Sequence, residues 1–176
     1  MITLVLKREY GCKGYTTGKM VERVTGFSCS TMERRDPQHW RGIKNYCAIK
    51  EGTYKLKVYT RENLKLNLQL SMTGAYHNAT LSGACAPHEL PAGSICVGRR
   101  IDPDTPIMKG GDEVLDGIDQ WIRQLMCDGH ITPKMKTGEI MLKVSYAEGY
   151  VWDEGKAEPK EEHHEEEQPD RWNFAE

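Results

Sequence analysis

The stretch TYKLKVY, residues 53–59, alternates polar and apolar side chains without a break. A period of two predicts a β-strand with one face in the core and the other in water. The stretch LKLNLQL, residues 64–70, repeats the pattern, and residues 60–63 between them are few enough for a hairpin. These two strands predict that the fold is built around a sheet.

Further strands are predicted on both sides of this hairpin, together with one helix. The strands are residues 2–8, 19–24, 26–32, 94–97 and 139–145, with a turn region at 11–18 and a long loop at 71–91. Within residues 112–127 apolar side chains recur at helical spacing, which predicts an amphipathic helix packed on the sheet. Asp112 suits its N-cap or first turn, and Gly129 suits its end. The predicted fold class is α+β: a mainly antiparallel curved sheet or small β-barrel with one amphipathic helix, in a single domain over residues 1–150.

Charge is distributed unevenly along the 176 residues. The net charge is -2, but residues 153–176 carry -7 and residues 1–152 carry +5. An acidic tail competes with phosphate for basic surface, so we expect no nucleic-acid partner. No apolar run approaches the roughly 20 residues of a membrane span. Residues 1–7 lack the features of a signal peptide, so we expect the cytoplasm of the producing cell.

The last segment, residues 151–176, is predicted to be an acidic and partly disordered extension, because it holds too few apolar residues to build a core. It nevertheless ends with two aromatic residues, Trp172 and Phe174. One interpretation is a frayed end, and the other is a short peptide that docks on a protein partner. The sequence leaves the oligomeric state open.

The segment AGSICVG, residues 92–98, is the main candidate for chemistry. It holds a hydroxyl (Ser94) and a thiol (Cys96) two residues apart, so both side chains share a face if the segment is extended. His77 lies upstream as a candidate base. A catalytic hypothesis therefore takes Ser94 as nucleophile, His77 as base and Cys96 as the alternative nucleophile, with backbone N–H groups as oxyanion hole. The alternative is a core strand between two glycines, with Cys96 as a small apolar filler.

Four motifs in the same order resemble an uncharacterised domain family of bacteria and their phages. The family pattern has a TxGK turn, a C-x-TLE segment, an A-I-P-x-G-T-Y strand, an I-H-x-G-N motif and a G-C-I-x-V-G segment. The I-H-x-G-N motif has no clear match here, and Tyr76-His77-Asn78 is only a fragment of it. The residues that correspond to the other four motifs are Thr17–Met20, Phe27–Glu33, Ala48–Tyr54 and Gly93–Gly98. That family is in turn distantly similar to L,D-transpeptidases, which act on peptidoglycan stem peptides through a cysteine acyl-enzyme.

This resemblance implies a peptidoglycan-directed, transpeptidase-like scaffold, with a cell-wall peptide as partner. The Gly-Cys of the family is Gly93-Ser94 here, and serine needs a well-placed base where cysteine does not. Any acyl-transfer or peptidase activity is therefore expected to be weakened or lost. The alternative function is a non-enzymatic structural or interaction protein, for example an accessory component of a phage particle that docks through its C-terminal tail.

A metal site is the third hypothesis, and otherwise no cofactor is expected. Cys85 and His88 have a Cys-x-x-His spacing and Cys96 follows, which together offer three zinc ligands. The six cysteines contain no Cys-x-x-Cys pair, so free buried thiols are expected, although the sequence leaves any disulfide pairing open.

Overall fold

The computed structural model describes residues 1–39, 47–61, 67–74, 79–83, 86–102 and 105–156. The large sheet contains β1 (Ile2–Cys12), β2 (Thr16–Val21), β3 (Ser28–Glu33), β4 (Gly52–Arg61), β5 (Asn67–Met72), β6 (Leu81–Ser82), β7 (Ile95–Gly98) and β10 (Ile140–Asp153). Two short strands, β8 (Arg100–Ile101) and β9 (Met108–Lys109), form a separate ribbon before the helix α1 (Gly111–Cys127).

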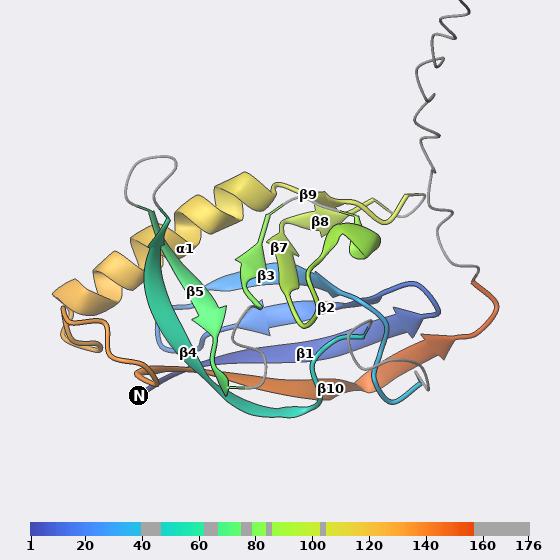
Figure 1. The fold of residues 1–176 in the computed structure, drawn as a ribbon, viewed down its shortest axis with the longest axis horizontal. Helices are drawn as coiled ribbons and strands as arrows, with labels where there is room; N and C mark the ends of the chain where they lie inside the picture. Colours follow the sequence, from blue (N-terminus) through green and yellow to red (C-terminus); the bar gives the residue numbers. More distant parts are fainter. Residues whose placement is uncertain (40–46, 62–66, 75–78, 84–85, 103–104, 157–176) are drawn as a thin grey trace, which may run out of the picture.

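The eight strands follow the order β5-β4-β10-β1-β2-β3-β7-β6 and curl into a nearly closed barrel (Figure 1). A bridge between Ser71 and Thr80 links the β5 end of the sheet to the β6 end. Most neighbours are antiparallel, but β1 pairs with β10, and β6 with β7, in parallel. The predicted fold class is confirmed: the protein is an α+β fold with a curved, mainly antiparallel sheet and one helix.

The helix α1 covers the open side of the barrel between β5 and β7. Its buried residues are Gly111, Leu115, Ile118, Trp121, Ile122 and Leu125, which is the stripe that the helical spacing predicted. Gly129 has a φ of 75° and follows the last turn, as expected for a glycine that ends a helix. The helix begins at Gly111, one residue before the predicted start; its N-cap is Gly110 and not Asp112, which lies in the first turn.

Several strand boundaries differ from the prediction. The predicted turn 11–18 is mostly strand, because β1 continues to Cys12 and β2 begins at Thr16. The predicted strand 19–24 ends at Val21, where Glu22 turns the chain. The loop 71–91 contains the short β6. Long-range pairing overrides local propensity at each place, since a strand ends where its neighbour ends.

Two apolar clusters lie on opposite faces of the sheet. The larger one fills the barrel between the sheet and α1, and includes Leu4, Leu6, Ile95, Val97 and Ile118. The smaller one contains Cys12, Tyr15, Met32, Leu90, Cys96 and Met108. Alternation therefore sends Ile95 and Val97 into the barrel, and Cys96 between them to the other face.

Candidate functional site

The Ser94 hydroxyl is buried and hydrogen-bonded to backbone. Its residue is 1% exposed, and its Oγ accepts a hydrogen bond from the N–H of Thr80 at 3.1 Å. Gly93 turns the chain with a φ of 76°, and the Ser94 N–H donates to the carbonyl of Pro91 at 3.0 Å. Within the described ranges, no histidine or carboxylate hydrogen-bonds to Ser94, and the predicted base His77 lies outside those ranges.

The Cys96 thiol is completely buried. Its Sγ donates to the carbonyl oxygen of Gly83 at 2.9 Å, and its side chain packs with Met32 and Met108 in the smaller cluster. A thiol enclosed by methionines behaves as a small apolar side chain and not as an exposed nucleophile. This position matches the core-filler interpretation of the segment.

The predicted zinc ligands are only partly described. Cys85 lies outside the described residues, as do Trp172 and Phe174. His88 is exposed in a short 3-10 turn, Pro87–Glu89, whereas Cys96 is buried. In the part of the chain that the structure describes, no group of three or more His, Cys, Asp or Glu residues is placed to hold a metal ion.

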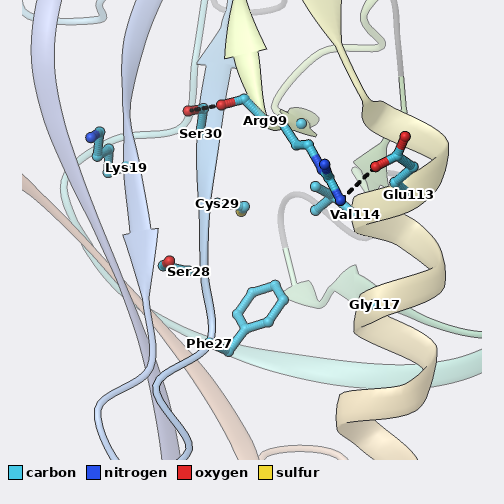
Figure 2. A pocket seen from close by; sticks show the side chains of 10 residues that line it. Lys19, Phe27, Ser28, Cys29, Ser30, Arg99, Glu113, Val114 and Gly117 are labelled. Atoms are coloured by element: carbon cyan, nitrogen blue, oxygen red, sulfur yellow. Dashed lines mark hydrogen bonds and ion pairs between the residues drawn. The ribbon is translucent and has the colours of Figure 1, made fainter.

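An open groove lies between the edge of β3 and the first half of α1 (Figure 2). Its volume is about 410 Å³, and it is lined by Lys19, Phe27, Ser28, Cys29, Ser30, Gly98, Arg99, Glu113, Val114 and Gly117. Phe27 and Val114 form its apolar part, and Phe27 stacks on Trp121 of the helix with ring centroids 5.3 Å apart. A Cβ added at Gly117 would meet no atom within 4 Å, so the helix wall is open at this glycine.

The groove exposes part of a strand edge. β3 pairs with β7 only through Ser30, Thr31 and Met32, so its first residues extend beyond β7. The carbonyl of Phe27 accepts a hydrogen bond from the N–H of Glu22 on the β2 side, at 2.8 Å. Because backbone groups alternate in direction along a strand, the N–H and C=O of Ser28 point to the opposite side, toward the groove.

Charged and polar side chains surround this edge. Arg99 forms an ion pair of 2.6 Å with Glu113, and its carbonyl accepts a hydrogen bond from Ser30 Oγ at 3.0 Å. Lys19 is exposed on the other side of the groove. Burial raises the pKa of the Cys29 thiol to about 12, so this thiol stays protonated at neutral pH and is a poor nucleophile. The groove therefore combines exposed charged and polar groups with an apolar patch, and its thiol is unreactive at neutral pH.

A buried polar cluster, absent from the prediction, occupies the barrel interior beyond Leu6. Arg8 is completely buried and donates two hydrogen bonds of 2.9 Å to Glu33, which is 1% exposed. Arg8 also donates to Tyr146 Oη at 3.0 Å and to the carbonyl of Ile49 at 2.6 Å. The sequence does contain a sign that Arg8 is buried. Every second side chain of a strand points to the same face, and Arg8 follows the inward residues 2, 4 and 6.

The buried carboxylate of Asp36 completes this polar cluster. It accepts hydrogen bonds from the hydroxyls of Tyr146 and Tyr150 and from the N–H of Gln38. Burial and the bond to Asp36 raise the pKa of both tyrosines, so both remain protonated donors. Burial alone lowers the pKa of Arg8, but Glu33 and Tyr146 outweigh it and raise that pKa overall. Since the charged and polar groups of this cluster hydrogen-bond to one another, we interpret the cluster as a stabilising element of the fold.

No described helix has the length and apolar character needed to cross a membrane. Comparisons with protein-family models, with curated proteins and with solved structures found no match for this chain.

Proposed function

We propose that this chain is a non-enzymatic binding module of bacterial or phage origin, built on a transpeptidase-like scaffold, that holds an extended segment of a protein partner between β3 and α1. The observation that carries the proposal is a contrast in accessibility. Ser94 and Cys96 are 1% and 0% exposed, whereas the groove between β3 and α1 is open.

The surroundings of Ser94 support a binding role over acyl-transfer chemistry. A nucleophilic serine needs an approach path for substrate and a base within hydrogen-bond reach. Here its Oγ accepts a backbone N–H bond from Thr80, and the thiol of Cys96 donates to Gly83. The Ser94 hydroxyl and the Cys96 thiol therefore each stabilise the neighbouring backbone. The proposal of a transpeptidase-like scaffold is supported by the four sequence motifs alone.

The groove has the features that favour binding of an extended peptide. The outward N–H and C=O of Ser28 offer backbone hydrogen bonds, as in recognition by strand addition. Phe27 and Val114 offer an apolar contact, and the bare Gly117 leaves room for a partner side chain. Main-chain bonds would supply affinity, and the apolar contact would supply selectivity.

The binding proposal is tested with a display library of random 12-residue peptides selected on the full chain. We expect enriched peptides whose Kd rises at least tenfold in Gly117→Trp, which fills the groove, and is unchanged in the matched control Gly117→Ala. Equal binding to wild type and Gly117→Trp, or no enrichment, would overturn the proposed groove. Circular dichroism of both variants verifies that the fold is intact.

The rival function is a transpeptidase-like activity on peptidoglycan, motivated by the motif order alone. It is tested by incubating purified muropeptides with wild type, Ser94→Ala and Cys96→Ala. We expect no turnover by any of the three. Turnover by wild type that is lost in Ser94→Ala would replace the binding proposal with a catalytic one. Elemental analysis of the same samples tests the zinc hypothesis.

A phage-particle accessory role with tail docking is a second non-enzymatic binding hypothesis. It places the contact on Trp172 and Phe174 instead of the groove. Replacing both aromatic residues with alanine should then abolish association with the particle, while leaving peptide binding in the groove unchanged.

A further inference from the structure

Four exposed lysines form a row across the outer face of the sheet, on four adjacent strands. They are Lys55 on β4, Lys143 on β10, Lys7 on β1 and Lys19 on β2. Each lies between inward-pointing core residues, so alternation turns all four ammonium groups away from the barrel. No helix covers this face in Figure 1, where α1 lies on the other side of the sheet. We call these four residues the lysine row.

The strand register fixes the spacing of the row. Lys7 lies directly opposite Lys19. Lys143 lies opposite Val5, which places it diagonally from Lys7. Lys55 lies opposite Met141, which places it diagonally from Lys143. Diagonal neighbours are roughly 7–8 Å apart and directly opposed residues about 5 Å, so the row is about 20 Å long.

The row has no counterion in the described structure. Like charges directly opposite each other destabilise a sheet, and Lys7 and Lys19 are such a pair. No ion pair to any of the four lysines is found among the described residues. The outward positions of residues 53–57, 141–145, 3–7 and 17–21 contain only Thr, Ser, Val, Met and Lys, and the acidic residue next to the row on β1 is the exposed Glu9, two residues beyond Lys7. With four lysines against this one glutamate, the row keeps a net positive charge. Such a surface favours an anionic ligand.

The C-terminal extension begins on this same face. The last described residue, Lys156, donates to Tyr15 Oη at 2.6 Å, and its ammonium lies 5.9 Å from the centre of the Tyr10 ring. Tyr10 donates to Asp153 Oδ2 at 2.9 Å, which fastens the end of β10 there. Tyr10 is opposite Thr17, and Thr17 is two residues, about 7 Å, from Lys19 along β2. The chain therefore continues from a point beside the end of the lysine row.

The composition of residues 157–176 matches the charge of the row. This segment has eight acidic residues against two basic ones, a net charge of -6. At roughly 3.3 Å per residue, about six or seven extended residues span a row of 20 Å. The acidic run 158–170 is twice that length. Because the segment is covalently attached, its effective concentration at the row is in the millimolar range or above.

We propose that the acidic extension, residues 157–176, folds back over the lysine row of its own chain, with its glutamates beside Lys19, Lys7, Lys143 and Lys55. The extension then supplies the missing counterions and excludes other polyanions from this face. The inference goes beyond the proposed function, since it concerns a different surface that shares only Lys19 with the groove.

The test is limited proteolysis of the full chain with a protease that cleaves after glutamate. At 20 mM salt, we expect cleavage within residues 161–167 to be at least fivefold slower in wild type than in the triple variant Lys7→Gln, Lys19→Gln, Lys143→Gln. The difference should vanish at 0.5 M salt, where charges are screened within a few ångströms. The matched control replaces three exposed lysines that lie outside the row, Lys50, Lys109 and Lys134, with glutamine, and should cleave like wild type.

Three results would overturn the proposal. One is equal cleavage of wild type and the triple variant at low salt. Another is the same acceleration in the control variant, which would assign the effect to net charge. The third is protection that grows with protein concentration, which would place the extension on a second copy of the chain. Peptide selection on the groove uses Gly117 and not the lysines, so its outcome is separate from this one.

Discussion

Replacing Arg8 by methionine tests whether the buried polar cluster determines stability. Arg8 and Glu33 are 0% and 1% exposed and share two hydrogen bonds of 2.9 Å. Methionine fills much of the same volume but leaves the Glu33 carboxylate buried without its partner. Breaking one side of a buried ion pair costs about 3–5 kcal/mol, which is a large part of the roughly 5–15 kcal/mol that stabilises a typical domain.

The double variant separates charge from packing. Arg8→Met with Glu33→Gln removes both charges, so the uncompensated carboxylate disappears. The remaining costs are the carbonyl of Ile49, which loses the hydrogen bond of 2.6 Å from Arg8, and the neutral amide at position 33, which loses both bonds from Arg8; each costs about 1–3 kcal/mol as an unsatisfied buried group, less than a buried unpaired carboxylate. We expect the double variant to be at least 1 kcal/mol more stable than Arg8→Met.

Urea unfolding of the full chain, followed by tryptophan fluorescence and circular dichroism, measures these free energies. Arg8→Lys provides a milder variant, because it keeps the charge but loses the two-pronged geometry; its cost should lie between wild type and Arg8→Met. The reasoning is refuted if Arg8→Met costs less than 1 kcal/mol. It is refuted equally if the double variant loses the sum of the two single losses, since the residues would then be uncoupled.

Three further predictions concern two glycines and one carboxylate. Gly117→Ala should stabilise the chain by about 0.5–1 kcal/mol in urea unfolding, because an added Cβ meets open space and a helix favours alanine over glycine; a loss of stability would show that the site is crowded. Gly18→Ala should destabilise it by about 1–3 kcal/mol, because the added Cβ would lie 2.3 Å from the Lys7 carbonyl oxygen; an unchanged midpoint would contradict that close approach. Burial tends to raise the pKa of Glu22, but its hydrogen bonds from Thr25 and Val24 outweigh this and lower that pKa below its ordinary value. The stability it contributes is therefore present above about pH 4.3 and is lost as the pH falls through the lowered pKa. Urea midpoints at pH 7 and pH 3 should show a smaller pH-dependent loss in Glu22→Gln than in wild type, and equal losses would refute this assignment.

Much of the site prediction depended on features that a sequence pattern does not contain. The sequence predicts a short strand at 94–97 between two glycines, and β7 occupies Ile95–Gly98. The pattern did not determine whether the side chains of Ser94 and Cys96 are exposed or buried. Ser94 becomes inaccessible because Thr80 packs against it from across the barrel closure, and the groove at β3 exists because β7 ends at Gly98, opposite Ser30.

The sequence by itself determined the strand at 53–59, the helix at 112–127 and the direction of their side chains. Alternation in 53–59 and helical spacing in 112–127 each depend on neighbours within a few residues, so both could be predicted. The same alternation along β1 also predicts that the side chain of Arg8 points inward.

Only the tertiary structure decided which strands lie side by side. β10 inserts between β4 and β1 and pairs in parallel with β1, and this arrangement aligns the lysine row. It also brings Arg8 to Glu33, 25 residues away. Period-two alternation fixes the face on which a side chain lies, but it does not say which strand lies beside which. Strand order and register depend on long-range packing of the whole barrel, and those contacts decide which charges meet, which remain exposed and which hydroxyls are buried.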